Sequence, residues 1–144
     1  MIIPYSYDYH DACVPVIKQF FDNSLEVFGQ EYTDETIANV ESNIANSCWL
    51  SVIRGKVVGM LGGYVTDSIT CKQKIFQEVI WYVDEKHRGT GVRLFAHLEK
   101  WCMQERVRQI VMASIHNDSH ESVHKFYLRK GYQAMETHYI KQLW

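Results

Sequence analysis

The chain has 144 residues, of which 47% are apolar and 22% charged, and its formal net charge at pH 7 is −2. This length predicts one domain over residues 1–144 with a buried core, and the composition excludes a disordered chain. No apolar run reaches membrane-spanning length and the start of the sequence lacks the basic residues of a signal peptide, so we expect a cytoplasmic protein with no membrane partner.

The first half of the sequence predicts a short strand, two helices and a hairpin, in that order. Their ranges are 1–7, 11–23, 33–46, 49–53 and 56–64. Thr33 is an N-cap residue followed by carboxylates that suit the positive end of a helix, and Arg54-Gly55 supplies the hairpin turn. Gly59, Gly62 and Gly63 weaken the second strand of the hairpin unless a ligand or a neighbouring backbone approaches closely there.

The second half predicts strands that alternate with helices. The ranges are a strand over 76–83, a helix over 94–105, a buried strand over 109–115, a helix over 119–130, and one or two closing strands over 132–143. The four cysteines are scattered and form no Cys-x-x-Cys pair, which fits free thiols in a reducing compartment.

A glycine-rich segment, His87-Arg88-Gly89-Thr90-Gly91-Val92, separates the strand over 76–83 from the helix over 94–105. Its two glycines let the backbone approach an anion closely. The first amides of the helix have no partner within the helix, and they lie at its positive end. The segment therefore predicts a phosphate-binding site of the kind found in many nucleotide and cofactor sites.

Two motifs together resemble those of one family. Arg88-Gly89-Thr90-Gly91 is similar to the pyrophosphate loop of the GCN5-related N-acetyltransferases (GNAT), whose pattern is Gln/Arg-x-x-Gly-x-Gly/Ala, and Phe126-Tyr127 followed by Gly131-Tyr132 is similar to their second signature. The resemblance covers residues 50 to 143 and implies the GNAT acyl-CoA acyltransferase fold of the α/β (α+β) class. That fold is a mixed, mostly antiparallel sheet flanked by helices, and its fourth and fifth strands splay apart to admit the pantetheine arm of acetyl-CoA.

The resemblance implies an acetyl-CoA-dependent N-acetyltransferase whose amine acceptor attacks directly in a ternary complex. Such a reaction needs a base for the amine, a hydrogen-bond donor for the thioester oxygen and an acid for the departing thiolate. Tyr127 matches the family's acid, and packing beside Phe126 is the alternative interpretation. Glu78 resembles the glutamate that many members use as the base, and partial burial should then raise its pKa toward neutral. A shift of one position along the strand would turn Gln77 into the cleft instead.

The resemblance also implies which residues hold acetyl-CoA. The pyrophosphate would bind the backbone amides from residue 88 to 94, that is Arg88, Gly89, Thr90, Gly91, Val92, Arg93 and the next residue, with the two arginine side chains as ion-pair partners. The Val83 backbone would pair with the pantetheine arm, and an amide near Trp81 or Tyr82 would polarise the thioester carbonyl. Free backbone groups in a strand require broken pairing, so we expect a β-bulge there.

Two positions depart from the family pattern. Arg93 stands where the family has Gly or Ala, so that its side chain either crowds the helix start or reaches for a phosphate. His120 stands where many members have an asparagine that contacts pantetheine, and Asn117, three residues upstream, is the candidate for that contact.

His120-Glu121-Ser122-Val123-His124 matches the His-Glu-x-x-His pattern of zinc proteases, and two histidines four residues apart on a helix can bind a metal. Tyr127 and Lys130 replace the Gly and the third His of one zinc-protease class. The chain also contains seven histidines, which makes a chance match easier. We therefore expect exposed helix residues and no metal here, and we expect His116 to end a strand outside this histidine stripe.

Charge is unevenly distributed along the sequence. Residues 1–50 carry eight acidic groups and one basic group, whereas residues 51–144 carry nine acidic and fourteen basic groups. This distribution suits a phosphate-rich ligand on the second part of the chain and a cationic amine acceptor on the first part. The candidates to line the acceptor's approach are Tyr5, Tyr7, Phe28 and Tyr32. Solvated helix faces would give the same distribution of charge. The balance is not basic enough to indicate nucleic acid.

Two other functions remain open from the sequence. One is a non-catalytic acyl-CoA-binding module that senses the cofactor or regulates a partner, and the other is a zinc hydrolase using His120 and His124. The sequence does not identify the acceptor amine or the preferred acyl chain. A homodimer is possible in this fold, but no sequence feature requires one.

Overall fold

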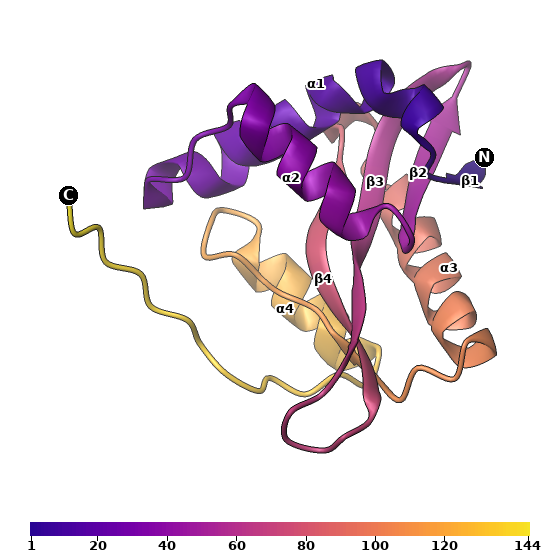
Figure 1. The fold of residues 1–144 in the computed structure, drawn as a ribbon, viewed down its shortest axis with the longest axis vertical. Coiled ribbons are helices and arrows are strands. Elements are labelled where there is room, and N and C mark those ends of the chain that lie inside the picture. Colours follow the sequence, from indigo (N-terminus) through magenta and orange to yellow (C-terminus); the bar gives the residue numbers. More distant parts are fainter.

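The computed structural model describes residues 1–144 and contains one five-stranded sheet with helices on both faces (Figure 1). The strands are β1 (Ile2–Pro4), β2 (Cys48–Ile53), β3 (Lys56–Asp67), β4 (Lys74–Val83) and β5 (Gln109–Val111). The α-helices are α1 (His10–Phe20), α2 (Asp34–Ile44), α3 (Thr90–Gln104) and α4 (His120–Arg129). Short helical turns are η1 (Tyr7–Tyr9), the π-helical η2 (Phe21–Leu25), η3 (Glu26–Phe28) and η4 (Glu85–His87).

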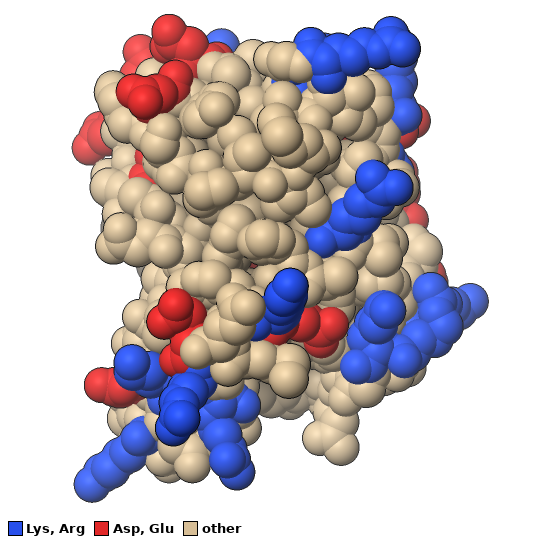
Figure 2. All heavy atoms as spheres, turned by 90° about the vertical axis from the view of Figure 1, so that its right-hand side faces the viewer, with Lys and Arg blue, Asp and Glu red and all other residues tan.

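The strand order is β1-β2-β3-β4-β5, and every neighbouring pair is antiparallel except β4 and β5, which are parallel. The predicted mixed, mostly antiparallel sheet is therefore confirmed. No helix is both long and apolar enough to cross a bilayer. Seen from the side of α3, basic side chains dominate the lower half and the right rim, and an acidic group gathers at the upper left (Figure 2).

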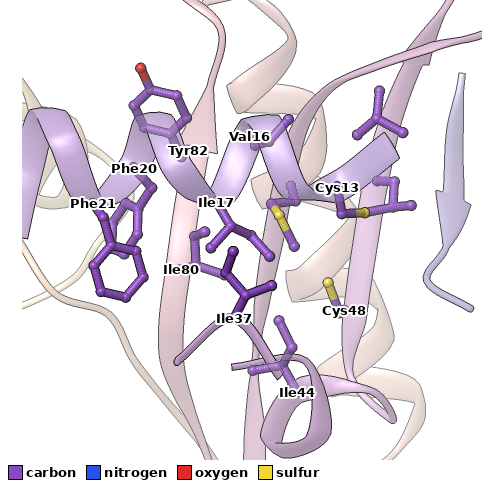
Figure 3. Close-up of a cluster of buried hydrophobic side chains, with 13 residues drawn as sticks. Cys13, Val16, Ile17, Phe20, Phe21, Ile37, Ile44, Cys48, Ile80 and Tyr82 are labelled. Carbon is purple, nitrogen blue, oxygen red and sulfur yellow. The ribbon is translucent and has the colours of Figure 1, made fainter. Parts of the chain in front are cut away.

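Each face of the sheet has its own hydrophobic core. On one face α1 and α2 pack against β2, β3 and β4, and Ile17, Ile44 and Ile80 are fully buried in this cluster (Figure 3). On the other face α3 contributes Leu94 and Leu98 to the second cluster. Burial of each such side chain contributes about 1.5–3 kcal/mol, so the two helical layers hold the sheet from both sides.

Local sequence explains where the helices begin and which face they bury. The buried residues of α1 are Cys13, Val16, Ile17 and Phe20, a spacing that gives one apolar stripe along a helix. Thr33 caps α2 by accepting a hydrogen bond from the Thr36 amide, and the Thr36 hydroxyl accepts from the Thr33 amide in return. The predicted N-cap is thus confirmed.

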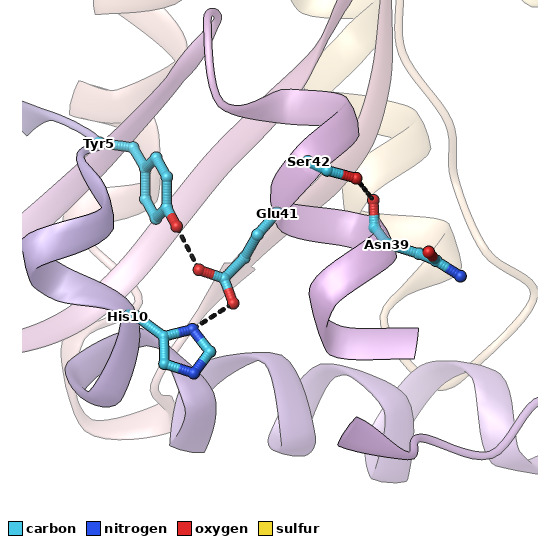
Figure 4. A network of polar contacts seen from close by, with 5 residues as sticks. All are labelled: Tyr5, His10, Asn39, Glu41 and Ser42. Atoms are coloured by element: carbon cyan, nitrogen blue, oxygen red, sulfur yellow. Dashed lines mark hydrogen bonds and ion pairs between the residues drawn. The ribbon is translucent and has the colours of Figure 1, made fainter. Parts of the chain in front are cut away.

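A buried carboxylate joins the N-terminal elements. Glu41 of α2 is 5% exposed and accepts hydrogen bonds from the Tyr5 hydroxyl and, on its other oxygen, from the ring of His10 (Figure 4). Burial, together with the bond to Glu41, raises the pKa of Tyr5. The contacts fix the start of α1 and the chain after β1 against α2, and no motif in the sequence indicated them.

The glycines of β3 allow its close pairing with β2 and β4. Arg54 and Gly55 both have positive φ, which matches the predicted tight hairpin turn between β2 and β3. At Gly63 a Cβ atom would lie 2.7 Å from the Phe76 ring and closer still to the carbonyl oxygen of Gln77. The β3–β4 register shifts between Gly62 and Gly63, so the glycines accommodate the backbone of the neighbouring strand.

Gly63→Ala should destabilise the chain by more than about 3 kcal/mol, because its methyl group would collide with the backbone of β4, which cannot move without breaking the sheet. Denaturant unfolding measures the effect. Gly89→Ala is the matched control: a Cβ there meets no atom within 4 Å, and its φ of −60° suits alanine. Equal stability of the two variants would contradict the close approach at Gly63.

β4 and β5 separate soon after they meet. Their parallel pairing covers Ile75 to Gln77 on β4 and Gln109 to Val111 on β5. Beyond Gln77 the edge of β4 that faces β5 has no strand partner. The predicted strand over 109–115 therefore ends at Val111, and residues 113–115 form one wall of an opening in the sheet. The predicted splaying of the fourth and fifth strands is confirmed.

The closing strands predicted over 132–143 are absent. Residues 132–144 have no helix or strand, and the tail leaves the end of α4 as an extended chain (Figure 1). Its apolar residues Met135, Tyr139, Ile140 and Leu143 are exposed, and no backbone amide after Tyr132 donates a hydrogen bond to the rest of the chain. Met135, Tyr139 and Leu143 would share one face of a strand, but Thr137 and Lys141 stand between them, so that face offers the sheet only an interrupted apolar surface.

Candidate active site

A cavity of about 700 Å³ lies between β4 and the chain that follows β5. Its walls come from α1, η2, η3, β4, the start of α3, the segment over 113–119 and α4. The sequence-predicted residues that line it are Glu78, Trp81, Tyr82, Val83, Arg88, Gly91, Asn117 and Tyr127. Gly89, Thr90, Val92 and Arg93 do not line it, although they adjoin Gly91 in the chain.

The cavity has walls on both faces of the sheet. Phe20 and Tyr82 belong to the core beneath α1, whereas Val83 belongs to the core beneath α3 and Trp81 packs against that second core. All four line the same cavity. It therefore passes through the gap that the separation of β4 and β5 opens in the sheet.

Glu78 faces this cavity and Gln77 does not. The β4 register is Glu78 opposite Gly63 and Ile80 opposite Gly62, so Val79 is the extra residue of a bulge. The expected bulge thus exists, but it lies two residues before Trp81. Because of the bulge Val79 and Ile80 both pack against the core beneath α1, which leaves Glu78 on the opposite face with Phe76.

Burial raises the pKa of Glu78 from its ordinary value to about 7, and a hydrogen bond from the Ala113 backbone amide opposes this shift in part. A carboxyl group with this pKa is half ionised near neutral pH. It can accept a proton from an amine and release it again, as a general base must.

Tyr127 of α4 stands close to Glu78 in the cavity wall. Its side chain is 9% exposed and its hydroxyl donates to the Ala113 carbonyl oxygen at 2.8 Å. Burial raises the pKa of Tyr127, and the nearby Glu78 carboxylate adds to the effect. Ala113, on the chain after β5, is therefore hydrogen-bonded through its amide to the candidate base and through its carbonyl to the candidate acid.

The start of α3 has the properties of an anion site. The first turn of α3 contains no acidic residue, and its N-cap Gly89 offers no side-chain hydrogen bond. In this region the Gly91 amide donates to the Arg88 carbonyl at 3.1 Å, and the first amides of an α-helix have no acceptor within the helix itself. These free amides at a positive helix end favour a phosphate.

Two buried polar atoms at the same place make no hydrogen bond: the Thr90 hydroxyl, and Nδ1 of His87, which lies 3.7 Å from the Asp84 carboxylate. Buried polar groups are nearly always hydrogen-bonded, so the Thr90 hydroxyl lacks a partner that water or a bound ligand would supply. Space is available as well, because nothing lies within 4 Å of a Cβ at Gly89. The residues present thus fit the diphosphate of acetyl-CoA.

The arginines differ in position. Arg88 lines the cavity and lies over the Tyr82 ring, 5.4 Å from its centroid, whereas Arg93 is exposed and does not line it. Arg93 therefore does not crowd the helix start. Val92 is likewise 47% exposed, so only its backbone is available to the site.

The edge of β4 from Glu78 to Val83 is free of strand pairing on the cavity side, as pairing with β5 ends at Gln77. Backbone N–H and C=O groups there are available to an extended ligand. Asn117 lies across the cavity at the end of the chain from β5. Ser114 and His116, also in this wall, were not predicted from the sequence, since no motif marks them.

The wall beneath α1 differs from the prediction. Tyr5, Tyr7, Phe28 and Tyr32 do not line the cavity; the residues that do are Phe20, Asn23, Ser24 and Val27. The prediction was wrong because it selected aromatic residues, whereas the π-helical turn η2 brings the small polar residues inward. Hydrophobic spacing does not reveal such a turn.

The histidines form a stack. The ring centroids of His116 and His120 are 4.1 Å apart, and those of His120 and His124 are 6.2 Å apart, with planes inclined by 22° in each pair. His116 thus extends the stripe, contrary to the prediction, because the chain turns back after β5. The rings lie face to face and do not converge on one point, and no three His, Cys, Asp or Glu side chains are grouped as metal ligands.

Comparison with known proteins gives a consistent result. A model of the acetyltransferase (GNAT) family matches residues 14–132 of the chain. No curated protein matches it.

Three solved structures illustrate the similarity of fold. A ribosomal-protein-alanine N-acetyltransferase from Brucella melitensis biovar Abortus 2308 has a TM-score of 0.78 at 15% identity, covering 99% of this chain and 98% of that one. An acetyltransferase from Trypanosoma brucei has a TM-score of 0.74 at 14% identity, covering 99% of both chains. An aminoglycoside acetyltransferase from an uncultured soil metagenomic sample has 0.73 at 14% identity, covering 99% and 97%.

Proposed function

Because the family match spans residues 14–132, the chain is an N-acetyltransferase of the GNAT family, and we propose that it holds acetyl-CoA and a primary amine together in the cavity between β4 and β5. The observation that carries this proposal is the placement of Glu78 and Tyr127 in one cavity with the start of α3. We further propose that residues 1–144 act as one catalytic domain.

Acetyl-CoA supplies an activated acetyl thioester. We assign its diphosphate to the backbone amides at the start of α3, with Arg88 as the charged partner. We assign its pantetheine arm to the unpaired edge of β4 near Val83. The acetyl group then lies at the bulge, between Glu78 and Tyr127.

The chain's own groups handle the protons. Glu78, with a pKa of about 7, accepts a proton from the ammonium form of the acceptor. The neutral amine then forms the C–N bond as the C–S bond breaks. Tyr127, whose raised pKa keeps it protonated, donates its proton to the departing sulfur, and the second proton of the acetylated nitrogen, released as the amide forms, returns to the Tyr127 oxygen. The proton held by Glu78 passes to solvent when the product leaves.

Calorimetric titration with acetyl-CoA, followed by measurement of thiol release with amine acceptors, tests this function. We expect micromolar binding that is insensitive to a zinc chelator, and turnover with at least one amine. Binding without turnover would favour the non-catalytic acyl-CoA module, and absence of binding would contradict the proposal.

Tyr127→Phe should lower kcat roughly tenfold to a thousandfold, while the Kd for acetyl-CoA changes little, because the ring stays in place and the variant loses only the acidic proton and the hydroxyl's hydrogen bond to the Ala113 carbonyl. Steady-state kinetics and calorimetry measure the two quantities.

Tyr132→Phe is the matched control for Tyr127→Phe. The Tyr132 hydroxyl donates to Glu99 at 3.1 Å and does not line the cavity. This variant should keep the wild-type rate. An unchanged rate in Tyr127→Phe would leave Tyr127 with a packing role only.

A further inference from the structure

The cavity wall beneath α1 is made of uncharged side chains. Phe20 and Ser24 are buried, and Asn23 and Val27 stand at its exposed margin. Acidic residues of the same segment, such as Asp22, do not line the cavity. Whatever approaches the reaction centre from this face meets apolar and neutral polar groups, and the charged group beside them is the Arg88 guanidinium over the Tyr82 ring.

Two of these neutral groups form a fixed pair. The Asn23 side-chain amide donates to the Tyr82 hydroxyl oxygen at 2.7 Å. This bond leaves the Asn23 carbonyl oxygen as an acceptor and the Tyr82 O–H as a donor, next to each other. An acceptor beside a donor is the complement of the N–H and C=O groups that a peptide backbone presents.

A third group adds to this wall. The Ser24 hydroxyl makes no hydrogen bond within the chain, although the residue is 7% exposed and lines the cavity. It offers one more donor or acceptor to a neutral polar ligand.

Charge also distinguishes the classes of amine. Glu78 is the acidic group inside the cavity, while Glu85 and Asp118 line it as exposed side chains. A polyamine or an aminoglycoside carries several positive charges and would need carboxylates on the wall beneath α1. A peptide α-amine has a single charge and a pKa of about 8, against about 10.4 for a lysine side chain. A Glu78 carboxylate with a pKa of about 7 suits removal of the proton from the peptide α-amine.

We propose that the acceptor is the N-terminal α-amine of a peptide or protein, whose first backbone groups bind Asn23 and Tyr82 as its amine reaches Glu78. This assignment rests on the proposed acetyl transfer. It makes Asn23 a residue that determines specificity and leaves the chemical step to other groups.

The test compares four acceptors with the full chain and saturating acetyl-CoA, by thiol release. They are a lysine-free tetrapeptide with a free N-terminus, a tetrapeptide with a blocked N-terminus and one lysine, spermidine, and kanamycin. We expect kcat/KM for the first to exceed each of the others at least tenfold. Preference for any other acceptor, or acetyl-CoA binding without turnover of the four, would overturn the α-amine assignment alone. Failure of the chain to bind acetyl-CoA would overturn the proposed acetyl transfer on which this assignment rests.

Asn23→Ala provides a second readout. It should raise the KM for the free tetrapeptide about fivefold to thirtyfold, with kcat and the Kd for acetyl-CoA within twofold of wild type, because only ground-state binding is lost. Asn23 is exposed, so the variant should fold. Asn39→Ala, at an exposed position of α2 away from the cavity, is the matched control and should change nothing. An unchanged KM in Asn23→Ala would overturn the role of this residue.

Discussion

Glu78→Gln should reduce kcat/KM by roughly 10²- to 10⁴-fold at pH 8, the range expected when a general base is removed. The wild-type kcat/KM should fall below about pH 7, as the carboxylate takes up a proton, and this acidic limb should vanish in the variant. Rate measurements from pH 5.5 to 9 with one acceptor would show both effects. Glu85→Gln, which removes an exposed carboxylate of the same cavity, should keep the wild-type profile.

Glu78→Gln should lower the activity but raise the free energy of unfolding relative to wild type near and above pH 7. Below about pH 4.5 Glu78 is protonated in both the folded and the unfolded chain. As the pH rises to about 7 the unfolded chain releases its proton first, so wild type loses up to about 3 kcal/mol of unfolding free energy that Glu78→Gln retains. Urea unfolding at pH 5 and pH 8 measures this difference. If the difference in unfolding free energy between Glu78→Gln and wild type were the same at pH 5 and at pH 8, Glu78 would not be held in a desolvated site.

Gly91→Trp should weaken acetyl-CoA binding by more than about a hundredfold. Gly91 lines the cavity at the start of α3, and an indole there would occupy the space through which a phosphate approaches the helix amides. Calorimetry with acetyl-CoA and with free CoA measures the loss, which should be similar for both because they share the diphosphate.

Gly91→Ala separates this effect from misfolding. A Cβ at Gly91 would lie 3.4 Å from Val83 and 3.6 Å from Trp81, which is ordinary contact. The alanine variant should therefore keep its melting temperature and show a smaller loss of affinity than tryptophan. Wild-type affinity in a folded Gly91→Trp would refute the assignment of the diphosphate to this helix start.

The sequence predicted those elements whose signals are local. Thr33 marks a helix start by its own hydrogen-bonding chemistry, and Gly55 supplies the positive φ that a tight hairpin turn needs. The prediction of closing strands was wrong: Met135, Tyr139 and Leu143 would share one face of a strand, but Thr137 and Lys141 interrupt that face and none of the three apolar side chains is buried.

Within the candidate site, the sequence indicated which residue types gather but not which way they face. One extra residue in β4, Val79, decides that Glu78 and not Gln77 enters the cavity, and nothing in the sequence around it specifies a bulge. The sequence did not predict Asn23 and Ser24 as cavity residues, because a π-helical turn changes the direction of side chains relative to regular helix spacing.

The passage through the sheet has a consequence for inhibitor design. A molecule that joins a CoA half to an acceptor half must place one part on each face of the sheet, with its linker in the gap between β4 and the chain after β5. If the conjugate enters from one face of the sheet, the half that binds on the other face must pass through that gap to reach its site. Such a conjugate should therefore associate slowly and dissociate more slowly still, whereas the two halves supplied separately should bind and leave independently.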